Sequence, residues 1–161
     1  MLSLPLKIFF DDEREGETEL TLLDSTAKKI SFLQELCALT ELKNVAFIAA
    51  RAEDAAHTKK HRESYDLAVS RAVANLSMLS ELCLPFVRSG GLFCPHKSAR
   101  AAGEVAGAGK ALGVLGAELS GEFSYTLGEN QPEMLILRAV KKRNTPPQYP
   151  RAFARIKSKP L

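Results

Sequence analysis

The sequence predicts an α/β fold with a mostly parallel sheet, helices on both of its faces and a closing antiparallel hairpin. Short apolar runs of strand length alternate with longer stretches in which apolar residues recur at helical spacing. The last two apolar runs are joined only by a polar turn, residues 128–132. At 161 residues, the chain has the size of one domain and can bury a core.

The elements follow from these patterns in chain order. We predict strands over residues 19–24, 45–49, 65–70 and 91–95, and a terminal hairpin with strands near 121–127 and 134–140. We predict helices over residues 27–42, 75–87 and 98–117. The stretches between Ile8 and Leu20 and over residues 54–64 are polar and are expected to be loops.

The basic residues are concentrated at the C-terminal end. Residues 141–161 contain seven lysines and arginines and no acid, so residues 1–140 are net negative. Pro146, Pro147 and Pro150 favour an extended or disordered segment. We therefore predict a domain over residues 1–140 and an extended basic tail over 141–161. The tail either binds a polyanion or only keeps the chain soluble, and charge alone leaves both possibilities open.

The rest of the sequence argues against metal sites, membrane-spanning helices and a secretion signal. Cys37, Cys83 and Cys94 are widely spaced without a CxxC or Cys/His cluster, which argues against zinc or another metal and predicts buried free thiols. No apolar run has the roughly 20 residues of a membrane helix, and no basic region precedes the apolar N-terminal patch. We expect a cytoplasmic protein without a membrane partner, and nothing indicates an oligomer.

Polar residues stand where the predicted parallel strands end. Asp24 ends the first strand, Arg51-Ala52-Glu53 follows the second, Arg71 the third and His96-Lys97 the fourth. Because ligands of open α/β sheets bind beyond the carboxyl ends of the strands, these residues are predicted to line one edge. This edge is the predicted ligand site.

Asp24 has two interpretations. A carboxylate at a strand end accepts hydrogen bonds from two ribose hydroxyls, but it can equally cap the helix that follows. No GxGxxG or GxxxxGK[ST] motif occurs, and the first glycine, Gly16, lies in an acidic loop. Composition and spacing therefore leave both roles open.

Seven segments occur together in one order. They are Leu2-Ser-Leu-Pro-Leu-Lys-Ile8, Leu23-Asp-Ser-Thr-Ala-Lys-Lys-Ile-Ser-Phe-Leu33, Arg51-Ala-Glu53, Ser70-Arg-Ala-Val-Ala74, Leu79-Ser-Glu-Leu-Cys-Leu-Pro85, Gly91-Leu-Phe93 with Lys97, and Asn144-Thr-Pro-Pro-Gln-Tyr-Pro-Arg151. In combination they resemble the bacterial methyltransferase family that methylates guanine N7 in small-subunit ribosomal RNA, also called glucose-inhibited division protein B. The resemblance covers nearly the whole chain.

The resemblance implies a class I, Rossmann-like fold that depends on S-adenosyl-L-methionine. It implies cofactor contacts, with Asp24 at the ribose, Ser25 and Thr26 beside it, Ala52 and Glu53 at the adenine, and Arg71 at cofactor or substrate. It places Lys97 in the loop at the target base. The implied RNA-binding residues are Arg71, Lys97, Lys141, Lys142, Arg143, Arg151 and Arg155.

The sequence departs from the family pattern at its front. Family members carry a helical segment, a first strand and a glycine-rich loop before the segment that begins here at Met1. We expect this chain to lack the first, central strand, and activity to be impaired for that reason. The alternative is a catalytically inactive RNA-binding fragment or pseudo-enzyme that keeps Arg71, Lys97 and the basic tail.

The implied reaction needs no general base. Guanine N7 has a free lone pair and loses no proton before it attacks a methyl sulfonium, so proximity and alignment suffice. His57, His61 and His96 are therefore expected to be surface or structural residues.

Overall fold

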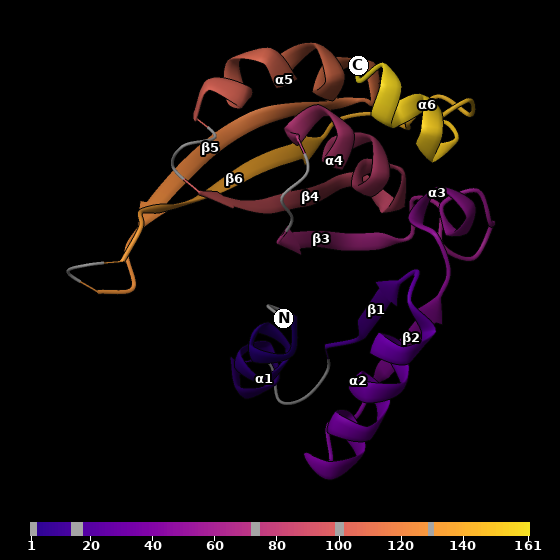
Figure 1. The fold of residues 1–161 in the computed structure, drawn as a ribbon, viewed down its shortest axis with the longest axis vertical. Helices are drawn as coiled ribbons and strands as arrows, with labels where there is room; N and C mark the ends of the chain where they lie inside the picture. The colour runs from indigo at the N-terminus through magenta and orange to yellow at the C-terminus, as the bar shows by residue number, and fades with distance from the viewer. Residues whose placement is uncertain (1–2, 14–17, 72–74, 99–101, 129–130) are drawn as a thin grey trace. The chain divides into compact units, whose positions relative to one another are not determined.

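The computed structural model describes residues 3–13, 18–71, 75–98, 102–128 and 131–161, which form two compact units, Met1–Asp54 and Ala55–Leu161 (Figure 1). The units divide within the helix α3 (Ala52–Ala55), and not at the predicted boundary between residues 140 and 141. No helix in the described part of the chain is long and apolar enough to cross a membrane.

The first unit contains a parallel strand pair. Strands β1 (Leu20–Asp24) and β2 (Val45–Ala49) pair in parallel, with Asp24 opposite Ala49. Helix α2 (Ala27–Leu39) connects them. Leu4, Leu22 and Cys37 form the buried core of this unit. Both strands match their predicted ranges, because apolar runs bounded by polar residues mark buried parallel strands well.

Two helices of this unit differ from prediction. Helix α2 ends at Leu39, three residues early, because the Thr40 hydroxyl donates to the Leu36 carbonyl at 2.8 Å and Glu41 takes a left-handed φ of 52°. Helix α1 (Ser3–Glu13) occupies part of the segment expected to be a loop. Within it, Lys7 pairs with Asp11 one turn later, which stabilises the helix despite its acidic end.

The second unit is built on a four-stranded mixed sheet in the order β3-β4-β6-β5. Strand β3 runs parallel to β4, whereas β6 is antiparallel to both β4 and β5. The strands are β3 (Tyr65–Arg71), β4 (Val87–Ser98), β5 (Ala117–Tyr125) and β6 (Met134–Lys141). The closing antiparallel hairpin is therefore confirmed.

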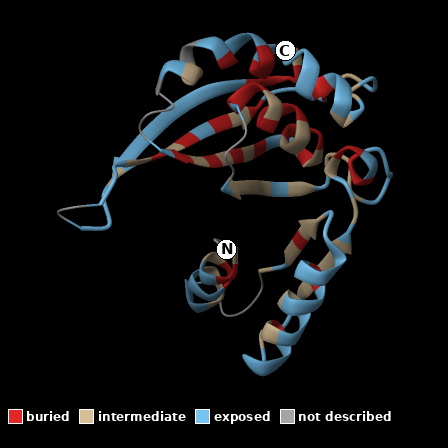
Figure 2. Ribbon diagram, in the orientation of Figure 1, coloured by how far each residue is buried: buried red, intermediate tan, exposed pale blue. Residues whose placement is uncertain are grey.

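The helices of this unit lie on one face of its sheet (Figure 1). They are α4 (Leu76–Cys83), the 3-10 helix η1 (Leu84–Phe86), α5 (Ala102–Val114) and α6 (Phe153–Ser158). The main core lies beneath α4 and α5, where Phe93, Leu84 and Leu115 are fully buried (Figure 2). Along β6, Leu135, Leu137 and Ala139 alternate inward toward this core, as the period of a strand requires.

The predicted helix over residues 75–87 is shorter in the structure. Helix α4 ends at Cys83, and the 3-10 turn leads directly into β4 at Val87. Pro85 explains the break, because a proline disfavours helical backbone at the preceding residue and donates no hydrogen bond. Strand β4 is consequently longer than predicted and begins before the glycine pair 90–91.

The α/β class is confirmed, but the described strands form two sheets instead of one. Among the described residues, β1 pairs only with β2, and β3 pairs only with β4. Each of these strands thus has one long edge without a strand partner in the described part of the chain.

The tail expected to be extended is ordered and packed against the second unit. Residues 153–158 form α6, and Ile156 is fully buried. Arg62 donates hydrogen bonds to the backbone carbonyls of Thr145 at 2.8 Å and Tyr149 at 2.9 Å. The tail thus follows a fixed path, because the carbonyls of Thr145, Pro146 and Tyr149 accept hydrogen bonds from the half-buried Arg62 guanidinium.

Candidate functional site

Asp24 lies at the carboxyl end of β1 and is partly exposed. Its Oδ1 accepts from the backbone N–H of Thr26 at 2.8 Å, and its Oδ2 accepts from Lys29 Nζ at 3.1 Å. The N-cap of α2 is Thr26, which makes no side-chain capping bond. Asp24 therefore stabilises the turn before α2, but it is not the N-cap residue of that helix.

The carboxylate of Asp24 retains accepting capacity. Two of its roughly four lone-pair positions are used by Thr26 and Lys29. Partial burial raises its pKa, but the hydrogen bonds from Thr26 and Lys29 outweigh this effect, so the pKa lies below its usual value. The group is ionised at neutral pH and can accept two further hydroxyl hydrogen bonds.

Ala52 and Glu53 follow the neighbouring strand at the same edge. Strand register sets Asp24 beside Ala49, and Ala52 begins α3 three residues later. The Glu53 side chain is largely buried, and Arg51 Nη1 lies 3.4 Å from its Oε1. The first unit therefore brings together Asp24, Ser25, Thr26, Ala52 and Glu53, which are the predicted cofactor-binding residues apart from Arg71.

Arg71 and Lys97 belong to the second unit and point to opposite faces of its sheet. Arg71 is exposed at the end of β3, where it lies beside His96. Lys97 is only 6% exposed, and its Nζ pairs with Glu104 of α5 at 3.0 Å. Glu104 also accepts from the backbone N–H of Leu76 at 2.9 Å. Lys97 thus joins α5 to the sheet, and the arrangement does not favour its predicted role at the target base.

Two predicted RNA-binding residues of the tail are structural. Lys141 is fully buried, and its Nζ donates to the carbonyls of Leu84 and Val87 and to Glu63. Burial lowers the pKa of Lys141, and the charge of Glu63 partly opposes that effect. Arg151 forms a pair with the fully buried Glu81. The arrangement does not favour an RNA contact by Lys141 or Arg151, because their charges are already compensated by Glu63 and Glu81.

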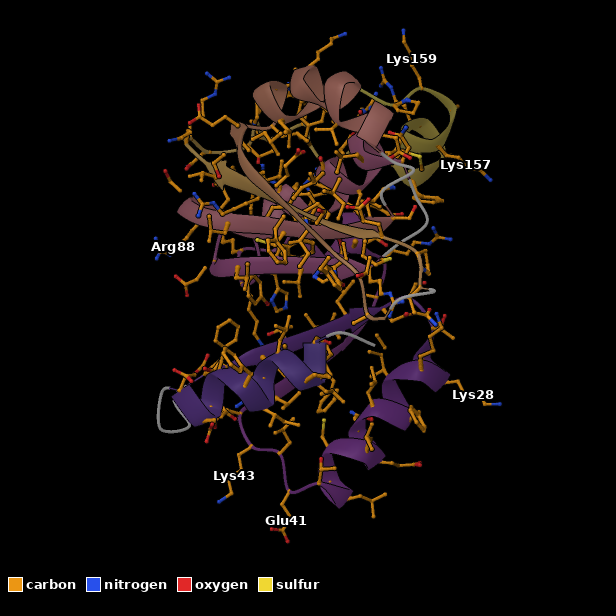
Figure 3. The ribbon with its side chains drawn as sticks, turned by 90° about the vertical axis from the view of Figure 1, so that its left-hand side faces the viewer. Lys28, Glu41, Lys43, Arg88, Lys157 and Lys159 are labelled. Carbon is orange, nitrogen blue, oxygen red and sulfur yellow. The ribbon has the colours of Figure 1, made fainter. Side chains whose placement is uncertain are left out.

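The other tail cations face solvent. Lys142 pairs with Glu118 at 2.8 Å, and Arg143 donates to the Gly113 carbonyl at 2.7 Å, yet both remain exposed. Arg155 is exposed on α6, and Figure 3 shows Lys157 and Lys159 extending outward from the same end of the chain. A basic surface therefore remains on α6 and the residue after it.

The histidines hold local structure. His57 Nε2 lies 2.9 Å from the Pro150 carbonyl, and His61 Nδ1 lies 2.7 Å from the Tyr65 hydroxyl. His96 Nδ1 lies 3.2 Å from the Tyr125 hydroxyl. Burial, with the nearby charge of Arg71, lowers the pKa of His96, so its ring is neutral at pH 7.

The cysteines differ in burial. Cys37 is buried, as predicted, whereas the residues Cys83 and Cys94 are half-buried. Burial of its thiol raises the pKa of Cys83 to about 12. All three are free thiols. In the described residues, no group of three histidine, cysteine or acidic side chains could hold a metal ion.

The free acceptor positions of the Asp24 carboxylate at the edge of β1 fit the ribose of an adenosyl cofactor. A ribose diol donates two hydrogen bonds and needs an ionised acceptor, which the exposed side of Asp24 offers. Ser25 and Thr26 are exposed, which leaves the turn accessible. The sequence found this acid, but it could not show that the carboxylate is already held by Thr26 and Lys29.

Solved structures share the fold. The TYW2 protein of M. jannaschii, solved in complex with AdoMet, superposes with a TM-score of 0.58 over 82% of this chain and 62% of its own, at 12% identity. An rRNA methylase from Streptococcus thermophilus matches with a TM-score of 0.55 over 78% of this chain and 74% of its own, at 15% identity. These likenesses confirm the class I methyltransferase fold.

Sequence relatives are much closer. The ribosomal RNA small subunit methyltransferase G of Alkaliphilus oremlandii is 46% identical over 89% of this chain and 60% of its own length. The protein of the same name from Oceanobacillus iheyensis is 40% identical over 99% of this chain and 65% of its own length. The chain thus spans less than two thirds of these relatives. Because the GidB model, described as rRNA small subunit methyltransferase G, matches residues 2–134, the chain belongs to that family.

Proposed function

We propose that this chain carries the cofactor-binding edge and the RNA-facing part of a methyltransferase that acts on guanine N7 of small-subunit ribosomal RNA. The observation that carries the proposal is Asp24, an ionised acceptor at the end of β1, within the segment that matches the family. We further propose that the chain acts in the cytoplasm, where ribosomal RNA is its partner.

Each residue of the site has a limited task in this proposal. S-adenosyl-L-methionine would supply the electrophilic methyl group when bound. Asp24 would accept hydrogen bonds from the ribose, and Ala52 and Glu53 would border the adenine. Arg71 would bind the guanine carbonyl or a phosphate, since its guanidinium offers paired donors. No residue need remove a proton, because guanine N7 attacks through its own lone pair.

The replacement of Asp24 by asparagine tests the cofactor site. Asparagine can still accept from the Thr26 N–H, so the turn should persist, but it loses the charge and one accepting oxygen. We expect S-adenosyl-L-methionine to bind about 10- to 150-fold more weakly, since a hydrogen bond to a charged group contributes about 1.5–3 kcal/mol. Isothermal titration calorimetry measures the change.

A matched control is Glu35→Ala, which removes an exposed acid from α2 of the same unit. Its affinity should equal that of the unchanged chain. Equal affinity of Asp24→Asn and the unchanged chain would contradict the ribose role. No measurable binding by the unchanged chain at millimolar cofactor would favour the second candidate, a catalytically inactive RNA-binding module.

The basic surface of α6 is tested by salt dependence. Removing residues 141–161 would also remove Lys141 and Arg151 from the fold, so single replacements are cleaner. We expect Arg155→Gln and Lys157→Gln each to reduce the slope of log affinity against log salt by about 0.7 for single-stranded RNA. Lys28→Gln, on the exposed side of α2, is the charge-matched control (Figure 3). Unchanged slopes in both tail variants would remove α6 from the RNA-binding surface.

A further inference from the structure

Lys29 lies in the first turn of α2, where a cation is unfavourable for the helix. Helix α2 begins with Ala27, Lys28 and Lys29 and has no acidic residue in its first turn. The N–H groups at the start of a helix carry partial positive charge, so acids are favoured there and lysines are disfavoured. Helix stability therefore does not explain Lys29, and a contact outside the helix is the better explanation.

That contact is the carboxylate of Asp24. Lys29 Nζ donates to Asp24 Oδ2 at 3.1 Å, reaching back from the helix to the end of β1. The backbone N–H of Thr26 donates to the other oxygen, Oδ1, at 2.8 Å. One side chain and one backbone group thus hold the two oxygens of the same carboxylate.

The division of these donors between the two oxygens matters for a ligand. Each oxygen of a carboxylate has about two acceptor positions. Thr26 uses one position on Oδ1 and Lys29 uses one on Oδ2, so one position remains on each oxygen. Two acceptors on neighbouring oxygens match two hydroxyl groups on neighbouring carbons. The arrangement therefore suits a vicinal diol better than a single hydroxyl.

The two hydrogen bonds also limit rotation of the carboxylate. The terminal torsion of an aspartate side chain is broad, so a carboxylate held at one oxygen can still turn. Hydrogen bonds to both oxygens restrict this torsion before a ligand arrives, which reduces the conformational entropy lost on binding. Thr26 holds Oδ1, and Lys29 supplies the second point of attachment at Oδ2.

We infer that Lys29 is a positioning residue of the cofactor site, which fixes the Asp24 carboxylate so that each oxygen accepts from one hydroxyl of the ribose. Lys29 acts through Asp24 and does not itself bind the ribose. The inference rests on the proposed function and adds to it the residue that sets the preference for an intact diol.

Replacing Lys29 with methionine tests this role. Methionine is a good helix former, and the change removes a cation from the positive end of α2, so the fold should persist. We expect S-adenosyl-L-homocysteine, the demethylated cofactor, to bind about 2- to 5-fold more weakly by isothermal titration calorimetry, within the range for an ion pair near the surface. Lys29→Arg should restore most of the affinity, because a guanidinium can also donate to Oδ2.

A second ligand separates positioning from a general effect on the fold. The 2′-deoxy form of S-adenosyl-L-homocysteine has one ribose hydroxyl, which can use the oxygen that Thr26 holds. Lys29→Met should therefore leave its affinity unchanged, and the preference for the intact diol should fall by the same 2- to 5-fold, roughly. A partly unfolded variant would lose affinity for both ligands equally.

Lys28→Met is the matched control, because it removes the same charge from the neighbouring residue of the same turn (Figure 3). Lys28 is exposed and is not among the groups that lower the pKa of Asp24. Its affinities for both ligands should equal those of the unchanged chain.

The outcomes separate this inference from the proposed function. Equal affinity of Lys29→Met and the unchanged chain for the intact diol would overturn the inference. Tighter binding by Lys29→Met would also overturn it, because the lysine would then compete with the ribose for Asp24. Equal losses for both ligands would assign Lys29 to folding and overturn it as well. In these three cases Asp24→Asn still decides the ribose role of Asp24, whereas no binding by the unchanged chain would overturn both.

Discussion

Replacing Arg151 with methionine is expected to lower the free energy of unfolding of the second unit by about 3–5 kcal/mol. Glu81 is fully buried, and Arg151 approaches it through its Nε at 2.7 Å and Nη2 at 2.6 Å. Without the guanidinium, the carboxylate keeps the Arg151 backbone N–H, at 2.9 Å, as its one hydrogen-bond donor among the described residues. An uncompensated buried charge must then be protonated or exposed, and both cost stability.

Urea denaturation followed by circular dichroism measures this loss as a lower midpoint at unchanged slope. Arg155→Met, at an exposed position of α6, is the matched control and should change stability by less than about 0.5 kcal/mol. The double variant Glu81→Met with Arg151→Met should recover much of the loss, because an apolar pair leaves no buried charge. Equal midpoints for Arg151→Met and Arg155→Met would show that the pair does not hold the tail.

Replacing Gly116 with alanine is the second change with a large expected effect. Gly116 has a φ of +85°, and a Cβ there would lie 2.3 Å from the backbone oxygen of Arg143. The left-handed backbone alone costs a non-glycine residue about 1–2 kcal/mol, and the clash adds to it. The turn between α5 and β5 would have to move away from the segment that follows β6. We expect a loss of at least about 2 kcal/mol by thermal or urea unfolding.

Gly109→Ala, in the neighbouring helix α5, is expected to change the stability in the opposite direction. Gly109 lies inside α5, and a Cβ there would meet nothing within 4 Å. Alanine should therefore stabilise the helix by about 0.5–1 kcal/mol. A loss of stability for Gly109→Ala, or none for Gly116→Ala, would contradict this account of the two glycines.

The sequence predicted the strands and turns that local residue patterns determine. Strands β1 and β2 follow from apolar runs that end in polar residues, and Asp24 stands at the predicted strand end. The closing hairpin follows from a polar turn between two strand-like runs. Helix α1 was missed because its acidic end suggested a loop, whereas burial of Leu4 and the pairing of Lys7 with Asp11 stabilise the helix.

The tail was misjudged because its partners are distant in sequence. Glu81 lies 70 residues before Arg151, and Glu63 lies 78 residues before Lys141, so no local pattern reveals either pair. Lys97 is different, because the alternation of side chains along β4 predicts the face of the sheet on which it lies. Phe93 and Lys97 share one face of β4, and the apolar character of Phe93 indicates that this face is covered. The prediction of a ligand contact for Lys97 used its position near a strand end and did not use this alternation.

The contacts of Arg62 have a consequence for how the end of this chain can vary. Arg62 reaches the carbonyl oxygens of Thr145, Pro146 and Tyr149, and no side-chain atom of these three residues is among its acceptors. Every amino acid presents the same backbone carbonyl group. The Arg62 guanidinium therefore recognises the path of the main chain and not the side chains along it. Arg62 therefore constrains the path of the main chain through these residues, whereas the Thr145 hydroxyl, which donates to the Leu115 carbonyl at 2.9 Å, constrains which residue can stand at that position.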